Sequence, residues 1–165
     1  MTKKQLSKKG PSAAKPLVSN TEGLTLLGGG SLPQVEVPST ALLETFVSPA
    51  PTRHYEICFS SNEFTSMCPI TGQPDYATIT IRYVPKDRCV ESKALKLYLR
   101  SFRNQGVFAE SIVNRMLDDL VEVLAPRSIT VIGDFTPRGG IGLCVEASYS
   151  EAEKKNLSKK TGKKK

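Results

Sequence analysis

The sequence has little of the chemistry that structural zinc sites need. It contains one histidine, His54, and its four cysteines, Cys58, Cys68, Cys89 and Cys144, include no C-x-x-C pair. A Cys/His zinc site is therefore poorly supported, and we expect no metal. Unpaired cysteines at these irregular spacings predict free thiols in a reducing compartment.

Long hydrophobic runs are also missing. No apolar stretch approaches the roughly 18–20 residues that a membrane span requires, and residues 1–20 lack the apolar segment of a secretory signal. We therefore expect a cytoplasmic protein with no membrane partner.

Acidic residues are scarce at the two ends, and this scarcity accounts for the net charge of +7. Residues 1–20 contain five Lys and no acid, and residues 151–165 contain seven Lys against two Glu. The other 130 residues contain 11 Lys and Arg against 14 Asp and Glu. A phosphate-binding groove spread over the folded part is thus not indicated, and no direct nucleic-acid partner is required.

Composition divides the chain into four segments. Residues 1–23 are rich in Lys, Ser and Pro and predict a disordered basic tail. Residues 24–52 contain Gly28–Gly30 and four prolines, which predict an extended N-terminal arm. Residues 53–149 form the predicted folded domain, and residues 150–165 a disordered Lys-rich tail.

The predicted domain contains two strands, then two helices, then two strands. Clean alternation of apolar and polar residues predicts the strand at residues 77–83, three further segments are interpreted as strands, and apolar residues at three- and four-residue steps predict the helices. The strands span residues 54–59, 77–83, 128–135 and 141–149, and the helices span 91–103, closed by Gly106, and 109–124, stopped by Pro126.

This order predicts an α+β fold, with both helices on one face of a four-stranded antiparallel sheet. About 100 ordered residues with an uncovered sheet face make a marginal monomer. We therefore expect a homo-oligomer in which a second subunit covers that face.

A turn-rich loop at residues 66–75, S-M-C-P-I-T-G-Q-P-D, contains a candidate nucleophile and acid, Cys68 and Asp75. A thiolate can attack an electrophilic carbon while a nearby carboxyl group transfers the proton. The thiol needs a partner or a positive environment to ionise near neutral pH. On the residues alone, a small packing cysteine beside an ordinary turn is the favoured alternative.

Three further features carry charge or flexibility suited to ligands. Lys93 and Lys96 share one face near a helix start and could hold a phosphorylated cofactor, or simply face solvent. Arg138 and Gly139 could approach a phosphate, or form a Gly-rich hairpin. Glu110 could interact with the helix dipole, or accept hydrogen bonds from a guanine-like edge.

Four segments together resemble one family. They are E-F-T-S-M-C-P-I-T-G-Q-P-D (63–75), V-E-S-K-A-L-K-L-Y (90–98), S-F-R-N-Q-G (101–106) and F-T-P-R-G-G-I (135–141). They are similar to the short form of the NADPH-dependent 7-cyano-7-deazaguanine reductases, the nitrile reductases of queuosine biosynthesis. The resemblance covers about residues 24–149.

The resemblance implies a tunnelling fold, in which two-helix, four-stranded units close into an oligomeric barrel with sites between subunits. It implies that Cys68 attacks the nitrile carbon to form a thioimide, with Asp75 as proton donor. Two NADPH molecules then deliver hydrides, and 7-aminomethyl-7-deazaguanine leaves.

The resemblance also implies binding roles, and it includes two departures. The family histidines are replaced here by Gln105 and Ala109, and Ala109 occupies a substrate-binding position but cannot handle protons. The implied substrate-binding residues are Val90, Glu91, Ser92, Ala109 and Glu110, and the implied cofactor-binding residues are Lys93, Lys96, Arg138 and Gly139.

Two alternatives stay open at this point. One is the archaeal relative that adds ammonia to the same nitrile in tRNA and uses no hydride. The other is an inactive paralogue that acts as a tRNA-binding or scaffold module.

Overall fold

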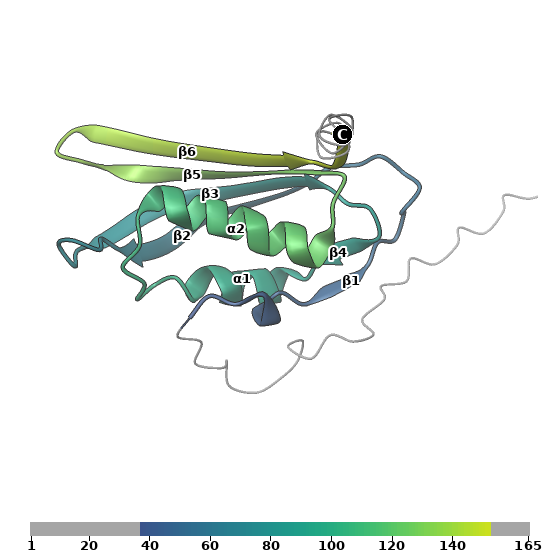
Figure 1. Ribbon diagram of the computed structural model, residues 1–165, viewed down its shortest axis with the longest axis horizontal. Coiled ribbons are helices and arrows are strands. Elements are labelled where there is room, and N and C mark those ends of the chain that lie inside the picture. The colour runs from purple at the N-terminus through teal and green to yellow at the C-terminus, as the bar shows by residue number, and fades with distance from the viewer. Residues whose placement is uncertain (1–36, 153–165) are drawn as a thin grey trace, which may run out of the picture.

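The computed structural model describes residues 37–152 (Figure 1). The predicted tail at residues 1–23, residues 24–36 of the predicted arm and residues 153–165 lie outside the described residues. Among the described residues, no helix is long and apolar enough to cross a membrane.

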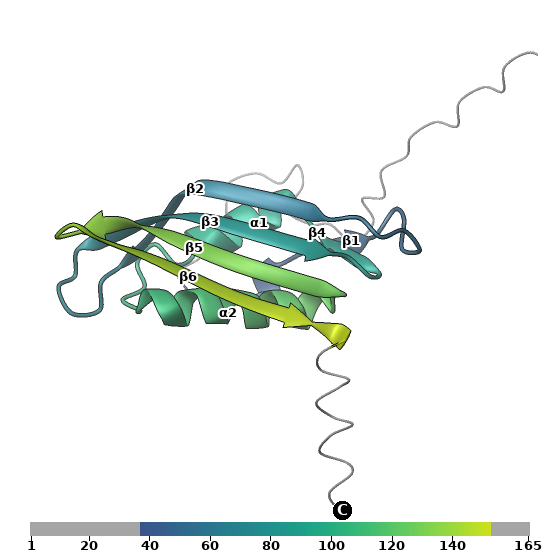
Figure 2. The ribbon, with the colours of Figure 1, turned by 90° about the horizontal axis from the view of Figure 1, so that it is seen from above.

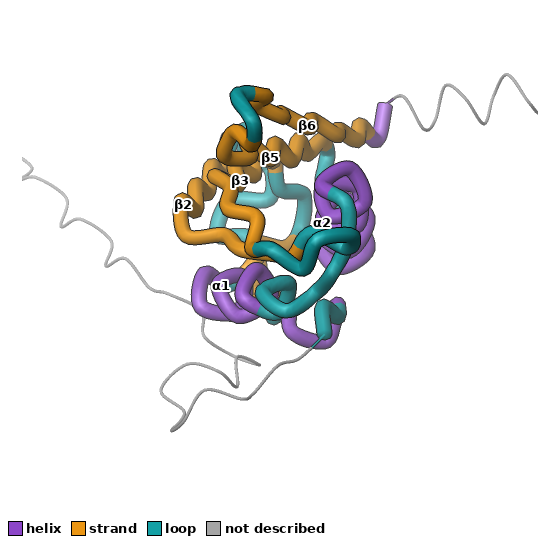
Figure 3. Tube along the Cα trace, turned by 90° about the vertical axis from the view of Figure 1, so that its left-hand side faces the viewer, coloured by secondary structure: helices purple, strands orange, loops and turns teal. Residues whose placement is uncertain are grey.

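The main sheet has four antiparallel strands in the order β2-β3-β5-β6. They are β2 (Ile57–Met67), β3 (Pro74–Val84), β5 (Ser128–Arg138) and β6 (Ile141–Ser150). Helices α1 (Ser92–Arg100) and α2 (Ala109–Leu124) cover one face of this sheet (Figure 3). Figure 2 shows the strands side by side, with α2 packed along β5 and β6. The predicted α+β architecture is confirmed.

Alternation along β3 explains which face the helices cover. Ile79, Ile81 and Tyr83 are fully buried against the helices, whereas Thr80 and Arg82 point to the opposite face. Burial of such apolar side chains is the main favourable term in folding. The opposite face is polar rather than apolar, and the prediction that a second subunit covers it stays a prediction.

The first strand is longer than the sequence predicted. It begins at Ile57 rather than His54 and continues to Met67, which pairs with Pro74. An irregularity in pairing lies between Ser61 and Phe64, just beyond the predicted residues 54–59. The connecting loop is therefore confined to residues 68–73.

The first helix is shorter than predicted, and Gly106 does not close it. It ends at Arg100, and the hydroxyl of Ser101 donates a hydrogen bond to the carbonyl of Tyr98. Gly106 instead forms a parallel bridge with Met67. The second helix has the predicted bounds and ends where Ala125 adopts a left-handed conformation, φ 42°.

A second, two-stranded sheet was not predicted. β1 (Thr45–Val47) pairs antiparallel with β4 (Arg88–Val90), and a 3₁₀ turn, η1 (Thr40–Leu42), precedes β1. Three-residue strands are too short to show a periodicity in the sequence. Through this pairing, part of the predicted arm lies against the start of α1.

Candidate active site

The loop between β2 and β3 places Cys68 at one end of the main sheet. The backbone N–H of Cys68 donates to the Gln73 carbonyl at 2.8 Å, and the Gly72 N–H donates to the Cys68 carbonyl at 3.0 Å. Gly72 has φ +65°, a conformation that side chains disfavour. The closed loop leaves the Cys68 side chain partly accessible.

The surroundings of Cys68 favour its thiolate. Hydrogen bonds from the Thr71 side chain and from the backbone of Thr71 and Ile70, together with the nearby charge of Arg138, lower the pKa of Cys68 to about 7. The thiolate is the nucleophilic form of cysteine. The loop and Arg138 together therefore favour the thiolate of Cys68 near neutral pH.

Asp75, the second residue of β3, is half-buried and forms an ion pair with Arg138. Nη2 of Arg138 lies 2.8 Å from Oδ1 of Asp75. The same nitrogen donates to the carbonyls of Pro74 at 2.7 Å and Gln73 at 3.3 Å. The structure therefore joins Asp75, Arg138 and the Cys68 loop in one cluster.

The start of α2 lies at this same end of the sheet (Figure 1). Met67 donates to the Gln105 carbonyl at 3.0 Å, and Val107 donates to the Met67 carbonyl at 3.2 Å. The segment leading into α2 thus runs beside the residue that precedes Cys68. Ala109 is half-buried and Glu110 is exposed, in the first turn of the helix.

The predicted substrate residues 90–92 lie at the opposite end of the sheet. The N–H of Val90 donates to the hydroxyl of Tyr83 at 3.1 Å. Tyr83 and Asp75 are eight residues apart on β3, which corresponds to roughly 26 Å at about 3.3 Å per residue. Within one chain, the structure does not bring residues 90–92 to Cys68.

Glu91 has a structural task in this chain. Its side chain caps α1, with Oε2 accepting from the Ala94 N–H at 2.8 Å, and the residue is only 6% exposed. Val90 is also buried, whereas Ser92 is exposed and lies in a groove described next.

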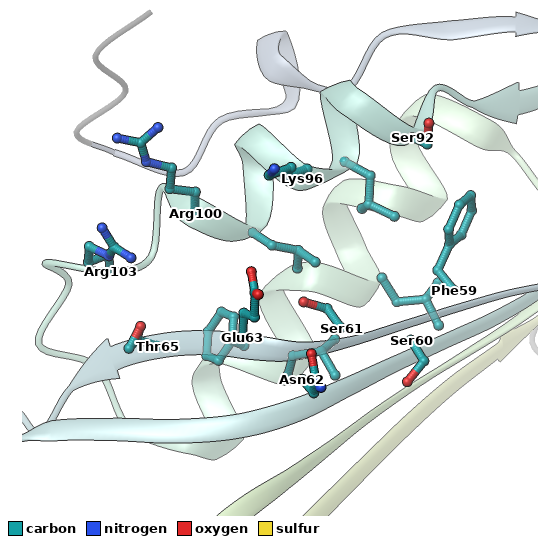
Figure 4. A pocket seen from close by; sticks show the side chains of 15 residues that line it. Phe59, Ser60, Ser61, Asn62, Glu63, Thr65, Ser92, Lys96, Arg100 and Arg103 are labelled. Carbon is teal, nitrogen blue, oxygen red and sulfur yellow. The ribbon is translucent and has the colours of Figure 1, made fainter. Parts of the chain in front are cut away.

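A groove of about 560 Å³ lies between β2 and α1 (Figure 4). Its floor is apolar, with Phe64, Ile79 and Leu95 among its lining residues. Lys96, a predicted cofactor-binding residue, lines the groove, together with two cations that sequence reasoning missed, Arg100 and Arg103. Their spacing of four and seven residues from Lys96 was the available signal. Lys93 is half-buried and is not among the lining residues.

The β5–β6 hairpin turns through Gly139 and Gly140, with φ +57° and +81°. Such a two-residue turn needs positive φ at both positions. The hairpin alternative for Gly139 is thus the observed structure. No group of three or more His, Cys, Asp and Glu side chains gathers within residues 37–152.

Comparisons with known proteins show which family the chain resembles. The model of the QueF-like protein family matches residues 74–154. The NADPH-dependent 7-cyano-7-deazaguanine reductase of Anaeromyxobacter sp. (strain Fw109-5) is 57% identical over 109 residues, covering 66% of this chain and 89% of that protein. The enzyme of the same name from Bacillus cytotoxicus is 48% identical over 133 residues, 81% of each chain.

The chain belongs to the family of NADPH-dependent 7-cyano-7-deazaguanine reductases. A reductase from Neisseria gonorrhoeae, 47% identical over 131 residues, covers 79% of this chain and 83% of its own. The crystal structure of the archaeosine synthase QueF-Like in the apo form has a TM-score of 0.52 and covers 61% of this chain and 94% of its own. At 19% identity, that similarity shows a shared fold alone.

Gln105 and Ala109, the two residues for which the resemblance implies histidines in the family, have different surroundings. Gln105 contributes its backbone carbonyl to Met67, a contact that any residue could make. Ala109 begins α2 beside Glu110 and offers no side chain to donate or accept a proton. The side chain of Ala109 therefore cannot transfer a proton.

Proposed function

We propose that this chain reduces the nitrile 7-cyano-7-deazaguanine to 7-aminomethyl-7-deazaguanine with NADPH, a step of queuosine biosynthesis, in the cytoplasm. The observation that carries the proposal is Cys68, an accessible thiol with its pKa lowered to about 7 beside the Asp75–Arg138 pair. Relatives that cover most of the described chain support the same reaction.

Cys68 begins the reaction as nucleophile. Its sulfur forms a bond to the nitrile carbon as one C–N π bond breaks, and the nitrogen takes up a proton to give a thioimide. Asp75, ion-paired at rest, accepts the proton of a thiol Cys68 and returns it to this nitrogen. Attack and protonation are thus balanced within the loop.

NADPH, bound twice in succession, would supply the two hydrides that convert the nitrile carbon to a methylene. The C–S bond would break after the first hydride transfer, with Cys68 leaving as a thiolate that its hydrogen bonds stabilise. Each hydride is matched by one proton on nitrogen. The net change is one nitrile, two NADPH and two protons to one amine and two NADP⁺.

Binding of the two ligands falls to different parts of the chain. Glu110 accepts hydrogen bonds from the donor edge of the guanine-like base. The phosphates of NADPH fit the groove, because Lys96, Arg100 and Arg103 line it above an apolar floor. Lys93, one turn nearer the start of α1, adds positive charge at that end.

A complete site needs a second copy of the chain. Cys68, Asp75 and Glu110 lie at one end of the sheet, and Val90, Glu91 and Ser92 lie at the other. A single base cannot span that length, so the two ends meet between neighbouring subunits. An oligomeric barrel of the tunnelling fold would bring them together.

The direct test is NADPH oxidation on addition of the nitrile, with and without ammonia and tRNA. Two NADPH consumed per nitrile and an aminomethyl product support the proposal. An amidine product that needs ammonia and no NADPH would transfer the chain to the amidine-forming reaction. Without NADPH, the nitrile mass should add to Cys68, and mapping to Cys58, Cys89 or Cys144 would refute the nucleophile.

A further inference from the structure

Ser66 places a buried hydroxyl two residues before the candidate nucleophile. Its side chain is fully buried near the end of β2, and within residues 37–152 its Oγ has no hydrogen-bond partner. Burial without a partner costs stability, because the hydroxyl has given up its hydrogen bonds to water. Such an atom in a folded protein calls for an explanation, and a role at a reactive site is one of the recognised ones.

The register of the main sheet places Ser66 directly opposite Asp75. Ser66 pairs with Asp75 in the antiparallel pair of β2 and β3, just as Phe64 pairs with Ala77. Opposite residues in such a pair point to the same face, with Cβ atoms about 4.5–5.5 Å apart. Phe64 and Ala77 belong to the core under the helices, so Ser66 and Asp75 lie on that face. Rotation about one side-chain bond brings the Ser66 hydroxyl within reach of the Asp75 carboxylate.

Cys68 extends the same side of the chain beyond the end of β2. Its N–H donates to the Gln73 carbonyl at 2.8 Å, so the ladder between the two strands continues by one more residue pair. Residues two positions apart in an extended chain share a face. Ser66 is therefore the neighbour of Asp75 across the strands and of Cys68 along the chain.

We propose that Ser66 is a positioning residue whose hydroxyl donates to the Asp75 carboxylate and holds it toward Cys68 during proton transfer. The proposal deepens the proposed function and rests on it for the roles of Cys68 and Asp75. The proton of Ser66 stays on its own oxygen, and the proton that moves is still the one exchanged among Cys68, Asp75 and the nitrile nitrogen.

The resting position of Asp75 explains why a second donor is needed. Oδ1 of Asp75 lies 2.8 Å from Nη2 of Arg138, so the carboxylate is directed at that guanidinium. A carboxylate that turns from Arg138 to the thiol gives up this ion pair, and its side chain is only 26% exposed to water. A hydroxyl on its own face of the sheet supplies the missing hydrogen bond.

The experiment compares Ser66→Ala with Ser48→Ala, a buried serine whose hydroxyl does have a partner. Ser48 is 3% exposed, and its Oγ lies 2.8 Å from the hydroxyl of Tyr55, at the other end of the molecule. Nitrile adduct formation without NADPH and iodoacetamide alkylation of Cys68 are followed by peptide mass spectrometry. Calorimetry gives the nitrile affinity in a Cys68→Ala background, where no adduct forms at this residue, and urea unfolding gives the stability.

Ser66→Ala should slow adduct formation at pH 7 by roughly tenfold, the order expected for one hydrogen bond to a charged group. Alkylation of Cys68 and nitrile affinity should stay within about twofold, because neither requires Asp75 to transfer a proton. The urea midpoint should equal or exceed that of the unmodified chain, since an unpartnered buried hydroxyl is removed. Ser48→Ala should show the opposite pattern, a lower urea midpoint and an unchanged adduct rate.

An Asp75→Asn background tests whether Ser66 acts through Asp75. Adding Ser66→Ala to Asp75→Asn should slow adduct formation no further, because residues of one network have non-additive effects. Additive losses would overturn the proposal, as would an unchanged adduct rate or a lower urea midpoint in Ser66→Ala. A large loss of nitrile affinity would also overturn it, because the hydroxyl would then contact the substrate.

Failure of the proposed function gives a different result. No nitrile adduct on Cys68 of the unmodified chain would refute both the function and the role of Ser66. Adduct formation at equal rates in the unmodified chain and in Ser66→Ala would refute the role of Ser66 alone.

Discussion

At the scale of single residues, Thr71 has the largest effect on the pKa of the candidate nucleophile, Cys68. Its hydroxyl hydrogen bond is the largest cause of the low pKa of Cys68, ahead of the backbone and of Arg138. The same oxygen is 3.4 Å from the Gln73 N–H, so it is held by the loop that it supports. Thr71 therefore couples the shape of the loop to the charge of the thiol.

We expect Thr71→Val to raise the pKa of Cys68 and Thr71→Ser to preserve it. In the unmodified chain, nitrile adduct formation should increase with pH through about 7, as the thiolate forms. In Thr71→Val the inflection should move to higher pH, so that the rate at pH 7 falls while the plateau at high pH is retained. Stopped-flow or mass-resolved adduct rates against pH provide the measurement. Coincident profiles for Val and Ser would contradict this role.

The sequence could predict Cys68 and Asp75 because a loop cysteine near a carboxylate is visible in the spacing. It could not predict Thr71 as a hydrogen-bond donor or Arg138 as the partner of Asp75. The first depends on the local turn of the loop, and the second joins residues 63 positions apart through strand register. Counting charged residues between the two tails also did not single out Arg100 and Arg103. A domain with little net charge can still place several cations in one groove.

At the scale of elements, the segment E-S-K-A-L-K-L-Y (91–98), one of the four that carry the resemblance, has largely structural contacts. Tyr98 is fully buried, and its hydroxyl donates to Asp119 of α2 at 2.8 Å. Arg115 also donates to Asp119, at 2.7 Å. Glu91 caps the start of the same helix. Only part of the E-S-K-x-x-K-x-Y pattern is thus left to contact ligands.

Glu91 offers a test that separates capping from recognition. Glu91→Ala should lower the free energy of unfolding by about 1 kcal/mol, because the Ala94 N–H loses its acceptor. Glu91→Gln keeps an oxygen that can accept this bond and should remain close to the unmodified chain in urea unfolding. The nitrile affinity of Glu91→Gln then tests whether Glu91 also contacts the substrate. If Glu91→Gln is stable yet loses nitrile affinity, the charge contacts substrate, whereas unchanged affinity leaves Glu91 as a cap.

Element boundaries were predictable where a period was long. The sixteen residues of α2 repeat their apolar face often enough to fix both ends. The alternation in β3 predicts residues 77–83, whereas the observed strand extends from Pro74 to Val84. β1 and β4 have three residues each and show no period. The predicted first strand ends at residue 59, whereas β2 continues to Met67 through a shift in pairing between Ser61 and Phe64.

The close packing of α2 on β5 predicts a sensitive glycine. A Cβ on Gly133 would lie 2.8 Å from Cγ2 of Val113 and 2.9 Å from Cε2 of Phe135. Gly133→Ala should therefore reduce the free energy of unfolding by about 1–3 kcal/mol. Gly142→Ala is the matched control on β6, because its Cβ would meet Pro137 at an ordinary 3.7 Å. Equal urea midpoints for the two variants would contradict this packing.

The whole molecule separates its functional ends by the length of β3. The end with Cys68, Asp75, Arg138 and Glu110 is assembled from three connections and the start of α2. The other end is formed where β4 meets α1, beside the small sheet that β1 completes. The groove runs between α1 and β2, between these two ends. Such a layout favours a site that two copies share.

Mixing two inactive variants tests this sharing. Cys68→Ala damages one end and Lys93→Ala damages the other, so each alone should turn over slowly. After co-refolding in equal amounts, about a quarter of the shared sites should combine an intact Cys68 end from one copy with an intact Lys93 end from another, as random assembly of a symmetric oligomer requires. NADPH oxidation should recover to that fraction of the unmodified rate.

Cys68→Ala mixed with Asp75→Asn is the matched control, because both changes lie at the same end and every shared site keeps one of the two substitutions. Native mass spectrometry establishes that mixed oligomers have formed. If mixed oligomers form in the first pair without recovery of NADPH oxidation, the shared site is contradicted. The whole reaction would then lie within one chain.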